Sequence, residues 1–467
     1  TTVGQFNATD PDVNSTLSFA LLDVNETDHA RFTLDQNGTL RIVAPFDFES
    51  NTTQFTLRIR VTDEWNATLD GNFTVSILNV IEDLDSDGTE DHLDTGLRGI
   101  PVGTCRTSYV DPIEGVHYVG YPVGDLVDLE EEDVIFLLLN KRLPDKDEAQ
   151  AFRKELAHRG AQIPTGALRV LETLTPGSGH PMDWLSIGIM AMGAAETTGD
   201  TRADSMNLIA RMPELMARIF ILRGGKKGGL KPRNTNLGLV ENFVHMLGIE
   251  GEEAERMNRV LRFFFILHMD HGGGNLSTFS GKAVASGWAS VYSALSSAMN
   301  ALSGPLHGRA NQACLEFVQR IGTSEPSEIE SFVRSELAAK RPIYGFGHGV
   351  LKAEDPRASL LIELGSEVCP EDENYKIVKA LREIIPPILK EHPKIRNPYP
   401  NVDIASGTLL HSIGFRKPDY YTTFFGWARV AGICAQILDE RESRDGRGVP
   451  IYRPKYLPVD QPLRRLD

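Results

Sequence analysis

The stretch SGWASVYSALSSAMNALSGPLHGRAN (286–311) joins a helix of small residues to an abrupt stop. Residues 286–304 have helical spacing, and their alanine, serine and glycine side chains would let neighbouring helices approach closely. Gly304-Pro305 ends this predicted helix, and one histidine, His307, follows directly before Gly308. Such a histidine is either a solvated loop residue or a side chain that the fold presents to a ligand.

The chain divides into an acidic head with strand patterns and a nearly neutral body with helix patterns. Residues 1–94 hold 18 acids and 4 arginines, and so carry −14 of the net charge of −16 of the 467-residue chain. Runs such as FTLRIRV (55–61) lie between Asn, Asp and Gly turns in the head, and stretches such as 147–160 have helical spacing in the body. We expect the boundary within 84–98. Neither part has the basic character of a nucleic-acid-binding protein.

The composition also indicates whether the chain could span a membrane and whether its cysteines are reduced. No apolar run approaches the ~20 residues that a membrane-spanning helix needs. The body holds all four cysteines, with no CxxC pair, which predicts reduced thiols rather than a disulfide framework. They are Cys105, Cys314, Cys369 and Cys434. The chain starts at threonine without a leader, so we expect a fragment or a mature form whose targeting signal cannot be read.

The segment DLDSDGTEDHLD (83–94) spaces its carboxylates as a calcium loop does. Alternate carboxylates can converge on one hard cation, and Gly88 permits the sharp bend that such a loop requires. The candidate ligands are Asp83, Asp85, Asp87, Asp91 and Asp94. The last of them is Asp rather than the longer Glu, so weak or incomplete coordination is expected. The alternative is a flexible acidic linker.

The motifs ATDPD (8–12), DFES (47–50) and VTDE (61–64), with a strand that ends NVIED (79–83), resemble a cadherin repeat. The resemblance implies a seven-stranded sandwich that binds calcium between repeats. It implies ligands at Asp10, Asp12, Glu49 and Asp63. The closing D-x-N-D-N of that family is only NVIED here, which leaves these sites open.

Seven N-x-T triplets also lie in the head. They could be glycosylation acceptors of a secretory pathway. The alternative is a Thr/Asn-rich bacterial surface domain. Their asparagines are Asn7, Asn14, Asn25, Asn37, Asn51, Asn66 and Asn72.

Three more motifs in the body combine histidine or aspartate with glycine: HMDHGGGN (268–275), YGFGHGVLKAEDPR (344–357) and KIRNPYPNVDIASG (394–407). Three histidines could bind a metal. The nearby cationic residues would instead repel a cation and bind carboxylates and phosphates. These residues are Arg357, Lys394, Arg396, Arg429 and Arg453. The pattern favours a small polyanionic substrate and a phosphorylated carrier. We interpret His268, on an apolar helix, as structural.

In this order, GPLHGRANQ (304–312) and the second and third of these motifs resemble citrate synthase, and most of all its mitochondrial-type branch. The resemblance runs from about Gly96 to the C-terminus. It implies an all-α, two-domain, homodimeric enzyme behind an all-β, cadherin-like sandwich. The expected domains are the sandwich at 1–82, a linker at 83–95, a large helical domain at 96–308 and 415–467, and a small helical domain at 309–414.

The resemblance also implies residue roles. Asp403 would remove a methyl proton from acetyl-CoA, His307 would stabilise the enol or enolate, and His348 would polarise the ketone of oxaloacetate. Citryl-CoA would then be hydrolysed to citrate and CoA, without a cofactor. The implied oxaloacetate ligands are His271, Arg357, Arg429 and, from the second subunit, Arg453, and the implied CoA ligands are Lys352, Lys394 and Arg396. Gly272 and Lys352 depart from the acidic residue and the arginine that are usual in the family.

Several alternatives remain open. A 2-methylcitrate synthase would use propionyl-CoA in the same site, since one methylene is worth only ~1–3 kcal/mol of discrimination. A calcium-dependent adhesion protein with an inert helical body is a second alternative. The third is a join of two unrelated reading frames, because adhesion modules work outside cells and acetyl-CoA is found inside. The body therefore predicts a cytoplasmic or matrix-like location, and the head predicts the cell surface.

Overall fold

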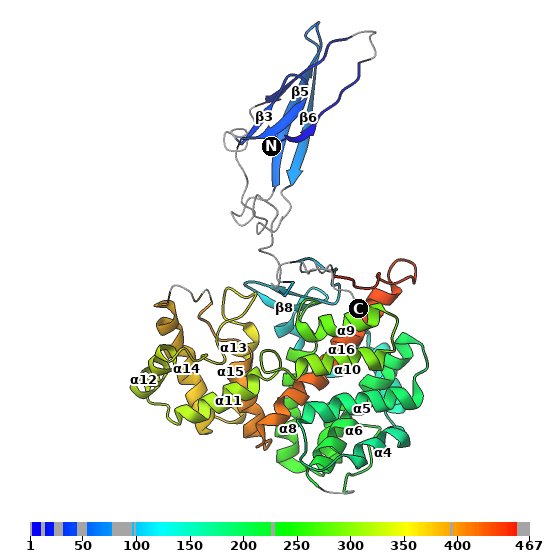
Figure 1. The fold of residues 1–467 in the computed structure, drawn as a ribbon, viewed down its shortest axis with the longest axis vertical. Helices are drawn as coiled ribbons and strands as arrows, with labels where there is room; N and C mark the ends of the chain where they lie inside the picture. The colour runs from blue at the N-terminus through cyan, green and yellow to red at the C-terminus, as the bar shows by residue number, and fades with distance from the viewer. Residues whose placement is uncertain are drawn as a thin grey trace, which may run out of the picture. The chain divides into compact units, whose positions relative to one another are not determined.

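The computed structural model describes residues 2–10, 15–22, 31–43, 54–76, 96–97, 100–225, 229–392, 395 and 397–454. The chain divides into two compact units, Thr1–Val102 and Gly103–Asp467. In Figure 1 the first unit consists of strands and the second mainly of helices. The division therefore follows the predicted change from strand to helix patterns, a few residues beyond the predicted boundary at 84–98.

The described residues of the first unit form two small antiparallel sheets, in the orders β1-β4-β3 and β2-β5-β6. Its described strands are β1 (Thr2–Gln5), β2 (Ser18–Leu22), β3 (Phe32–Leu34), β4 (Thr39–Ile42), β5 (Gln54–Thr62) and β6 (Thr68–Ser76). β5 and β6 pair in register from Gln54 opposite Ser76 to Thr62 opposite Thr68. The all-β prediction for the head is confirmed.

Alternation along β5 explains how this small unit makes a core. Phe55 and Leu57 are buried and Arg58 is exposed, as the period of two in a strand requires. The buried residues pack with Phe32 and Leu40 of the other sheet. Sheets this small can therefore bury one shared apolar face.

The second unit is built from helices, as predicted. Its described helices are α2 (Glu131–Asn140), α3 (Lys146–Arg159), α4 (Thr165–Thr173), α5 (Pro181–Glu196), α6 (Thr201–Arg223), α7 (Leu239–Met246), α8 (Gly251–His268), α9 (Leu276–Ser286), α10 (Val291–Leu302), α11 (Ala310–Ile321), α12 (Pro326–Ala338), α13 (Pro356–Val368), α14 (Glu373–Lys390), α15 (Asp403–Ser412) and α16 (Tyr421–Glu442). A small sheet, β7 (Ser108–Asp111), β8 (Gly115–Tyr118) and β9 (Tyr121–Pro122), precedes them and was not predicted. Within the described residues, no helix is both long and apolar enough to cross a membrane.

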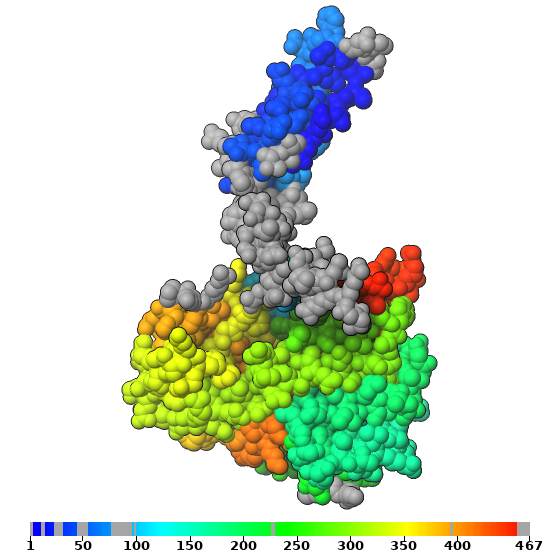
Figure 2. All heavy atoms as spheres, in the orientation of Figure 1, coloured from blue at the N-terminus to red at the C-terminus, as the bar shows by residue number. Residues whose placement is uncertain are grey.

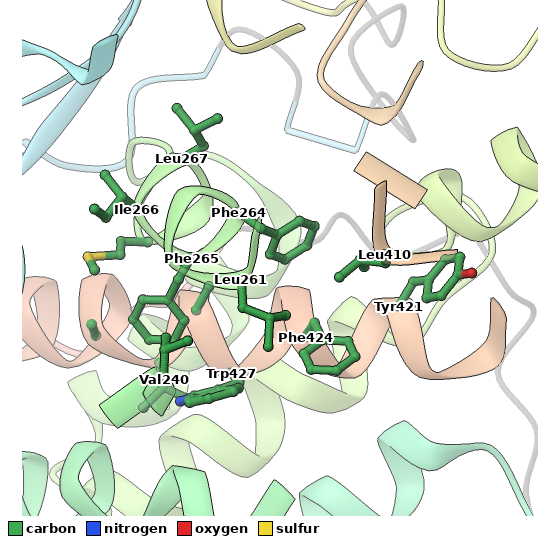
Figure 3. Close-up of a cluster of buried hydrophobic side chains, with 14 of the residues drawn as sticks. Val240, Leu261, Phe264, Phe265, Ile266, Leu267, Leu410, Tyr421, Phe424 and Trp427 are labelled. Atoms are coloured by element: carbon green, nitrogen blue, oxygen red, sulfur yellow. The ribbon is translucent and has the colours of Figure 1, made fainter. Parts of the chain in front are cut away.

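α16 is the central helix of this unit. All but one of residues 421–440 are buried, and the helix contacts α2, α5, α6, α8, α9 and α10. Figure 3 shows Phe424 and Trp427 of α16 beside Leu261 and Phe265 of α8 in one apolar cluster. A helix that is buried on all sides lies in the interior of its unit, and α16 thereby contacts most of the helices around it.

The helix predicted at 286–304 begins later than expected. Ser286 is the last residue of α9, and α10 starts at Val291. Between them Trp288 has a φ of 61°, and the Ser290 hydroxyl accepts a hydrogen bond from the Ser293 backbone N–H at 3.1 Å. The prediction of one continuous helix was wrong here, because a serine cap starts a new helix.

The helices α11 to α15 pack on one another and also on α8 and α16. On the face drawn in Figure 2, segments from distant parts of the sequence share the surface of the helical unit. The division of this unit into a large domain and a small domain at 309–414 stays a prediction.

Candidate active site

The His271 loop lies between the end of α8 and the start of α9. The His271 backbone N–H donates to the Asp270 carboxylate at 2.9 Å, and the His271 carbonyl accepts from the Asn275 side chain at 3.2 Å. Asn275 also caps α9 through the Thr278 backbone N–H. Burial lowers the pKa of His271 well below its ordinary value, and the charges of Arg357 and Arg429 add to the effect. The loop therefore presents a neutral imidazole.

His307 lies in the turn between α10 and α11. Its Nε2 accepts from the Ser277 backbone N–H at 3.1 Å and lies 3.1 Å from the Ser277 hydroxyl. A backbone N–H can only donate, so Nε2 carries the lone pair and the proton of the neutral ring is on Nδ1. Burial, with the charge of Arg429, lowers the pKa of His307 to about 4. At neutral pH this histidine can donate one hydrogen bond from Nδ1.

His348 has the opposite tautomer. Its Nδ1 accepts from the backbone N–H groups of Val350 and Leu351, both at 3.0 Å. The proton of the neutral ring is therefore on Nε2. Burial, and then the charge of Arg357, lowers the pKa of His348. The rings of His348 and His271 lie 5.4 Å apart between centroids, so two of the predicted motifs meet.

Two loops that are far apart in sequence are joined by backbone hydrogen bonds beside His348. The Asn401 backbone N–H donates to the Gly345 carbonyl at 2.9 Å, and the Gly347 N–H donates to the Tyr399 carbonyl at 2.9 Å. The Asn401 side chain donates to the Gly347 carbonyl at 2.7 Å. Gly345 has a φ of +81°, and a Cβ there would lie 2.8 Å from the Cys314 sulfur. Glycine is thus required for the two loops to join.

Asp403 is the first residue of α15 and follows this junction directly. Its backbone N–H donates to the Asn401 side chain at 3.0 Å. Burial raises the pKa of Asp403 to about 6, with the Arg357 charge opposing the rise and the Asp355 charge adding to it. Asp403 is therefore ionised at neutral pH and is a stronger base than an ordinary aspartate.

Two buried arginines lie near these residues and differ in their partners. Arg357 forms a fork with Asp355, with Nε–Oδ1 at 3.0 Å and Nη2–Oδ2 at 2.8 Å. Arg429 instead donates from Nε to the His268 carbonyl at 2.9 Å, and no carboxylate of the described residues lies within ion-pair distance of it. A buried charge without a counter-ion is costly, so Arg429 is suited to bind an anion.

The other predicted ligand residues lie at the surface, in the first unit or outside the described ranges. Lys352 and Arg453 are exposed, and the Lys352 backbone N–H donates to the Pro112 carbonyl at 2.7 Å. The Asp63 carboxylate accepts from the backbone N–H groups of Trp65 and Ala67 and so holds a turn. Asp10 ends the described segment 2–10. The predicted residues outside the described ranges are Lys394, Arg396, Asp12, Glu49, Asp83, Asp85, Asp87, Asp91 and Asp94.

His268 is structural, as interpreted from the sequence. It is buried, its Nδ1 lies 2.7 Å from the Phe264 carbonyl, and its ring stacks on that of Phe264. The described part of the chain contains one group of three potential metal ligands, Glu130 to Glu132, and no histidine belongs to it. Arg262 already forms ion pairs with Glu130 and Glu131. The described residues thus give no support to the alternative of a histidine metal site.

Sequence reasoning missed the residues that orient the predicted ones. Asn275, Ser277, Asp355 and Asn401 all act through backbone contacts or a paired charge. A local signal existed for some of them, because Asn275 and Asp355 each stand directly before a helix, where such residues serve as caps. Ser277 had no such signal.

Comparison with known proteins gives a consistent result. Residues 96–455 match the family described as "Citrate synthase, C-terminal domain", and residues 1–79 match "Cadherin domain". The mitochondrial citrate synthase of Citrus maxima is 34% identical over 78% of this chain and 82% of its own length.

Solved structures agree. The citrate synthase of Thermotoga maritima has a TM-score of 0.68 and 30% identity, over 79% of this chain and 96% of that one. The Thermoplasma acidophilum enzyme, whose structure is a ternary complex with carboxymethyl coenzyme A and oxaloacetate, has a TM-score of 0.70 and 25% identity. That match covers 79% of this chain and 97% of the other.

Proposed function

Since this chain belongs to the citrate synthase family and is an enzyme that makes citrate, we propose that it condenses acetyl-CoA with oxaloacetate and hydrolyses citryl-CoA to citrate and CoA. One observation carries the assignment of roles. The charge of Arg357 acts on the pKa values of His271, His348 and Asp403, which are shifted first of all by burial. The charge of Arg429 acts in the same way on His271 and His307, and the rings of His271 and His348 lie 5.4 Å apart, which supports one shared buried site.

Asp403 is the base in this proposal. Its carboxylate takes a proton from the methyl group of acetyl-CoA, and its raised pKa makes it a better acceptor than an ordinary aspartate. The methyl group is still a very weak acid. Deprotonation therefore requires stabilisation of the charge that develops on the thioester oxygen.

His307 supplies that stabilisation by donating from Nδ1 to the thioester oxygen. The Ser277 N–H on Nε2 holds the ring in the required tautomer. His348 donates from Nε2 to the ketone oxygen of oxaloacetate, so the ketone carbon becomes more electrophilic as the new carbon–carbon bond forms. Both rings are neutral, and each donates a hydrogen bond to an oxygen on which negative charge develops in this step.

In this proposal the buried arginines bind the carboxylates of the substrate. Arg429 has no carboxylate partner among the described residues, and Arg357 has its Nη1 beyond the fork to Asp355. With His271 they would bind the two carboxylates of oxaloacetate. We further propose a homodimer in which the exposed Arg453 of the second subunit completes this set, and that Lys352, Lys394 and Arg396 bind CoA.

The substitution Asp403→Asn tests the base. We expect it to abolish condensation but to change oxaloacetate affinity by only a few-fold, because the substituted group does not hold the substrate carboxylates. Release of CoA from acetyl-CoA and oxaloacetate measures turnover, and calorimetry measures oxaloacetate binding. Asp445→Asn, at an exposed aspartate, is the matched control. Turnover of Asp403→Asn within tenfold of the parent would contradict the assignment.

The preference between acetyl-CoA and propionyl-CoA distinguishes the proposed activity from that of a 2-methylcitrate synthase. Because the chain resembles the mitochondrial-type branch, we expect acetyl-CoA to exceed propionyl-CoA in kcat/KM by at least about tenfold, which lies within the discrimination that one methylene permits. The same CoA-release assay with the two thioesters decides it. A ratio near one or below would favour the methylcitrate activity.

For the first unit, which matches the cadherin family, we propose calcium binding at the 83–94 loop and at Asp10, Asp12, Glu49 and Asp63. The support is the spacing of the carboxylates in the sequence. The catalytic unit works where acetyl-CoA is present, in the cytoplasm or a matrix-like compartment, whereas the first unit is of a type found at cell surfaces.

A further inference from the structure

A buried carboxylate, Asp270, stands directly before His271 and is held by three neutral donors. Its Oδ2 accepts from the Thr107 hydroxyl at 2.7 Å. Its Oδ1 accepts from the Gln436 side chain at 2.8 Å and from the His271 backbone N–H at 2.9 Å. Asp270 and Thr107 are both 0% exposed. A carboxylate so placed must have its lone pairs satisfied, because an unpartnered buried charge is strongly disfavoured.

The guanidinium of Arg429 is close enough to Asp270 for their charges to interact. The two groups nevertheless form no ion pair. Arg357 differs, because Asp355 neutralises it in a two-bond fork. The two buried arginines therefore differ, because Arg357 is paired with a carboxylate and Arg429 is not.

One of these donors, Gln436, and the neighbour of Thr107, Ser108, hold the other side of His271. The Ser108 hydroxyl accepts from the Gly272 backbone N–H at 2.8 Å, and Gln436 donates to the Gly272 carbonyl at 3.0 Å. Thr107 directly precedes β7, Ser108 is the first residue of β7, and Gln436 belongs to α16. Elements more than 160 residues apart thus fix the backbone on both sides of His271.

We propose that Thr107 is a positioning residue for substrate binding. Its hydroxyl keeps the Asp270 carboxylate on the His271 backbone and away from Arg429, so that Arg429 stays available for a carboxylate of oxaloacetate. Without the hydroxyl, Asp270 would be free to turn to the guanidinium of Arg429, with which its charge interacts, and would compete with the substrate. This inference rests on the proposed function, because it takes oxaloacetate as the anion.

The test uses the full chain with Thr107→Val, which removes the hydroxyl at nearly constant volume, and Thr107→Ser, which keeps it. For Thr107→Val we expect the KM and the calorimetric Kd for oxaloacetate to rise about tenfold, the effect of losing one hydrogen bond to a charged group. The kcat and the KM for acetyl-CoA should stay within about twofold. Thr107→Ser should behave as the parent does. Thr173→Val, which removes an exposed hydroxyl, is the matched control.

Gln436→Met is a second variant, which removes another donor of Asp270 and should raise the same KM even if Thr107→Val does not fold. Unchanged oxaloacetate affinity in the folded variants would overturn the inference, and so would equal losses in kcat and in both KM values. If the parent binds oxaloacetate but releases no CoA, the proposed reaction fails while the calorimetric comparison still decides the role of Thr107. If the parent does not bind oxaloacetate, both proposals fail.

Discussion

At the scale of single residues, backbone hydrogen bonds decide what each histidine can do. The Ser277 N–H fixes the proton of His307 on Nδ1, and the Val350 and Leu351 N–H groups fix the proton of His348 on Nε2. Side chains rotate, but these backbone groups are held by helix α9 and by a tight turn. In the proposed site these two rings would be donors whose directions are set before a substrate arrives, which is the condition for strong electrostatic stabilisation.

The pH dependence of kcat/KM follows from Asp403 and His307. The pKa of Asp403 is raised to about 6 by burial, so the base is protonated and inactive below that pH. The pKa of His307 is lowered to about 4, so this ring stays neutral over the same range. We expect kcat/KM to be flat near pH 7–8 and to fall about tenfold per pH unit below about 6, since this ratio reports the free enzyme.

Initial rates of CoA release in buffers of constant ionic strength measure this profile. Circular dichroism at each pH controls for loss of the fold. An acidic limb with its midpoint at the ordinary aspartate pKa would contradict the effect of burial, and an unchanged rate at low pH would contradict the assignment of Asp403.

At the scale of elements, the start of α7 depends on two buried glutamates of α2. Glu132 accepts from the Leu239 backbone N–H at 2.7 Å, and Glu131 accepts from the Val240 N–H at 2.9 Å. They satisfy N–H groups that a helix leaves without partners at its first turn. Burial, together with the charge of Glu131, raises the pKa of Glu132 to about 8.

The contribution of Glu132 to the free energy of unfolding should therefore change with pH. Below the ordinary glutamate pKa, Glu132 is protonated in the folded and in the unfolded chain. Between that value and about 8 only the folded chain keeps the proton, so the free energy of unfolding falls as the pH rises. Glu132→Gln keeps the oxygen that caps α7 and has no proton to lose.

We expect Glu132→Gln to raise the Tm relative to the parent, by little near pH 5 and by roughly 2–4 °C near pH 8. Thermal unfolding followed by circular dichroism measures the difference. Glu148→Gln is the matched control of opposite sign, because hydrogen bonds from Arg142 and from the Asp145 backbone lower the pKa of Glu148 to about 2. A Tm difference for Glu132→Gln that does not grow with pH would show that the cap, and not the charge, governs the effect.

At the scale of the whole molecule, each unit has its own core. Phe32, Leu40, Phe55 and Leu57 form that of the first unit, and a separate cluster that runs from Val116 to Leu438 forms that of the second. All the described residues that we assign to catalysis lie in the second unit. Units with separate cores are expected to fold and unfold as separate bodies.

Deletion of residues 1–94 should therefore leave kcat within about twofold and the Tm of the helical unit nearly unchanged. Rate measurements and calorimetry on the shortened chain test this. Removal of calcium with a chelator should lower only the unfolding transition of the first unit. If the deletion unfolds the helical unit, or if calcium changes kcat by more than a few-fold, the two units are coupled and the first has a regulatory role.

The sequence by itself determined the class of each unit. Period-two alternation in residues 55–61 identified strands, and helical spacing identified the body, because both patterns are local and a strand or helix imposes them residue by residue. Glycines around His307 and His348 marked two histidines that the sequence places outside regular helices, and both lie outside helices in the structure. The ordered motifs then identified the family.

Only the tertiary structure decided what surrounds those residues. Thr107 meets Asp270 across 163 positions of sequence, and Ser277 meets His307 across 30. The small sheet β7–β9, the cap at Ser290 and the pairing of Arg357 with Asp355 were also missed, although their partners are close in the sequence, as Ser290 and Ser293 are. A local pattern records which face of an element is apolar, but a hydrogen-bond partner or a shift in pKa arises only when distant elements pack and exclude water between them.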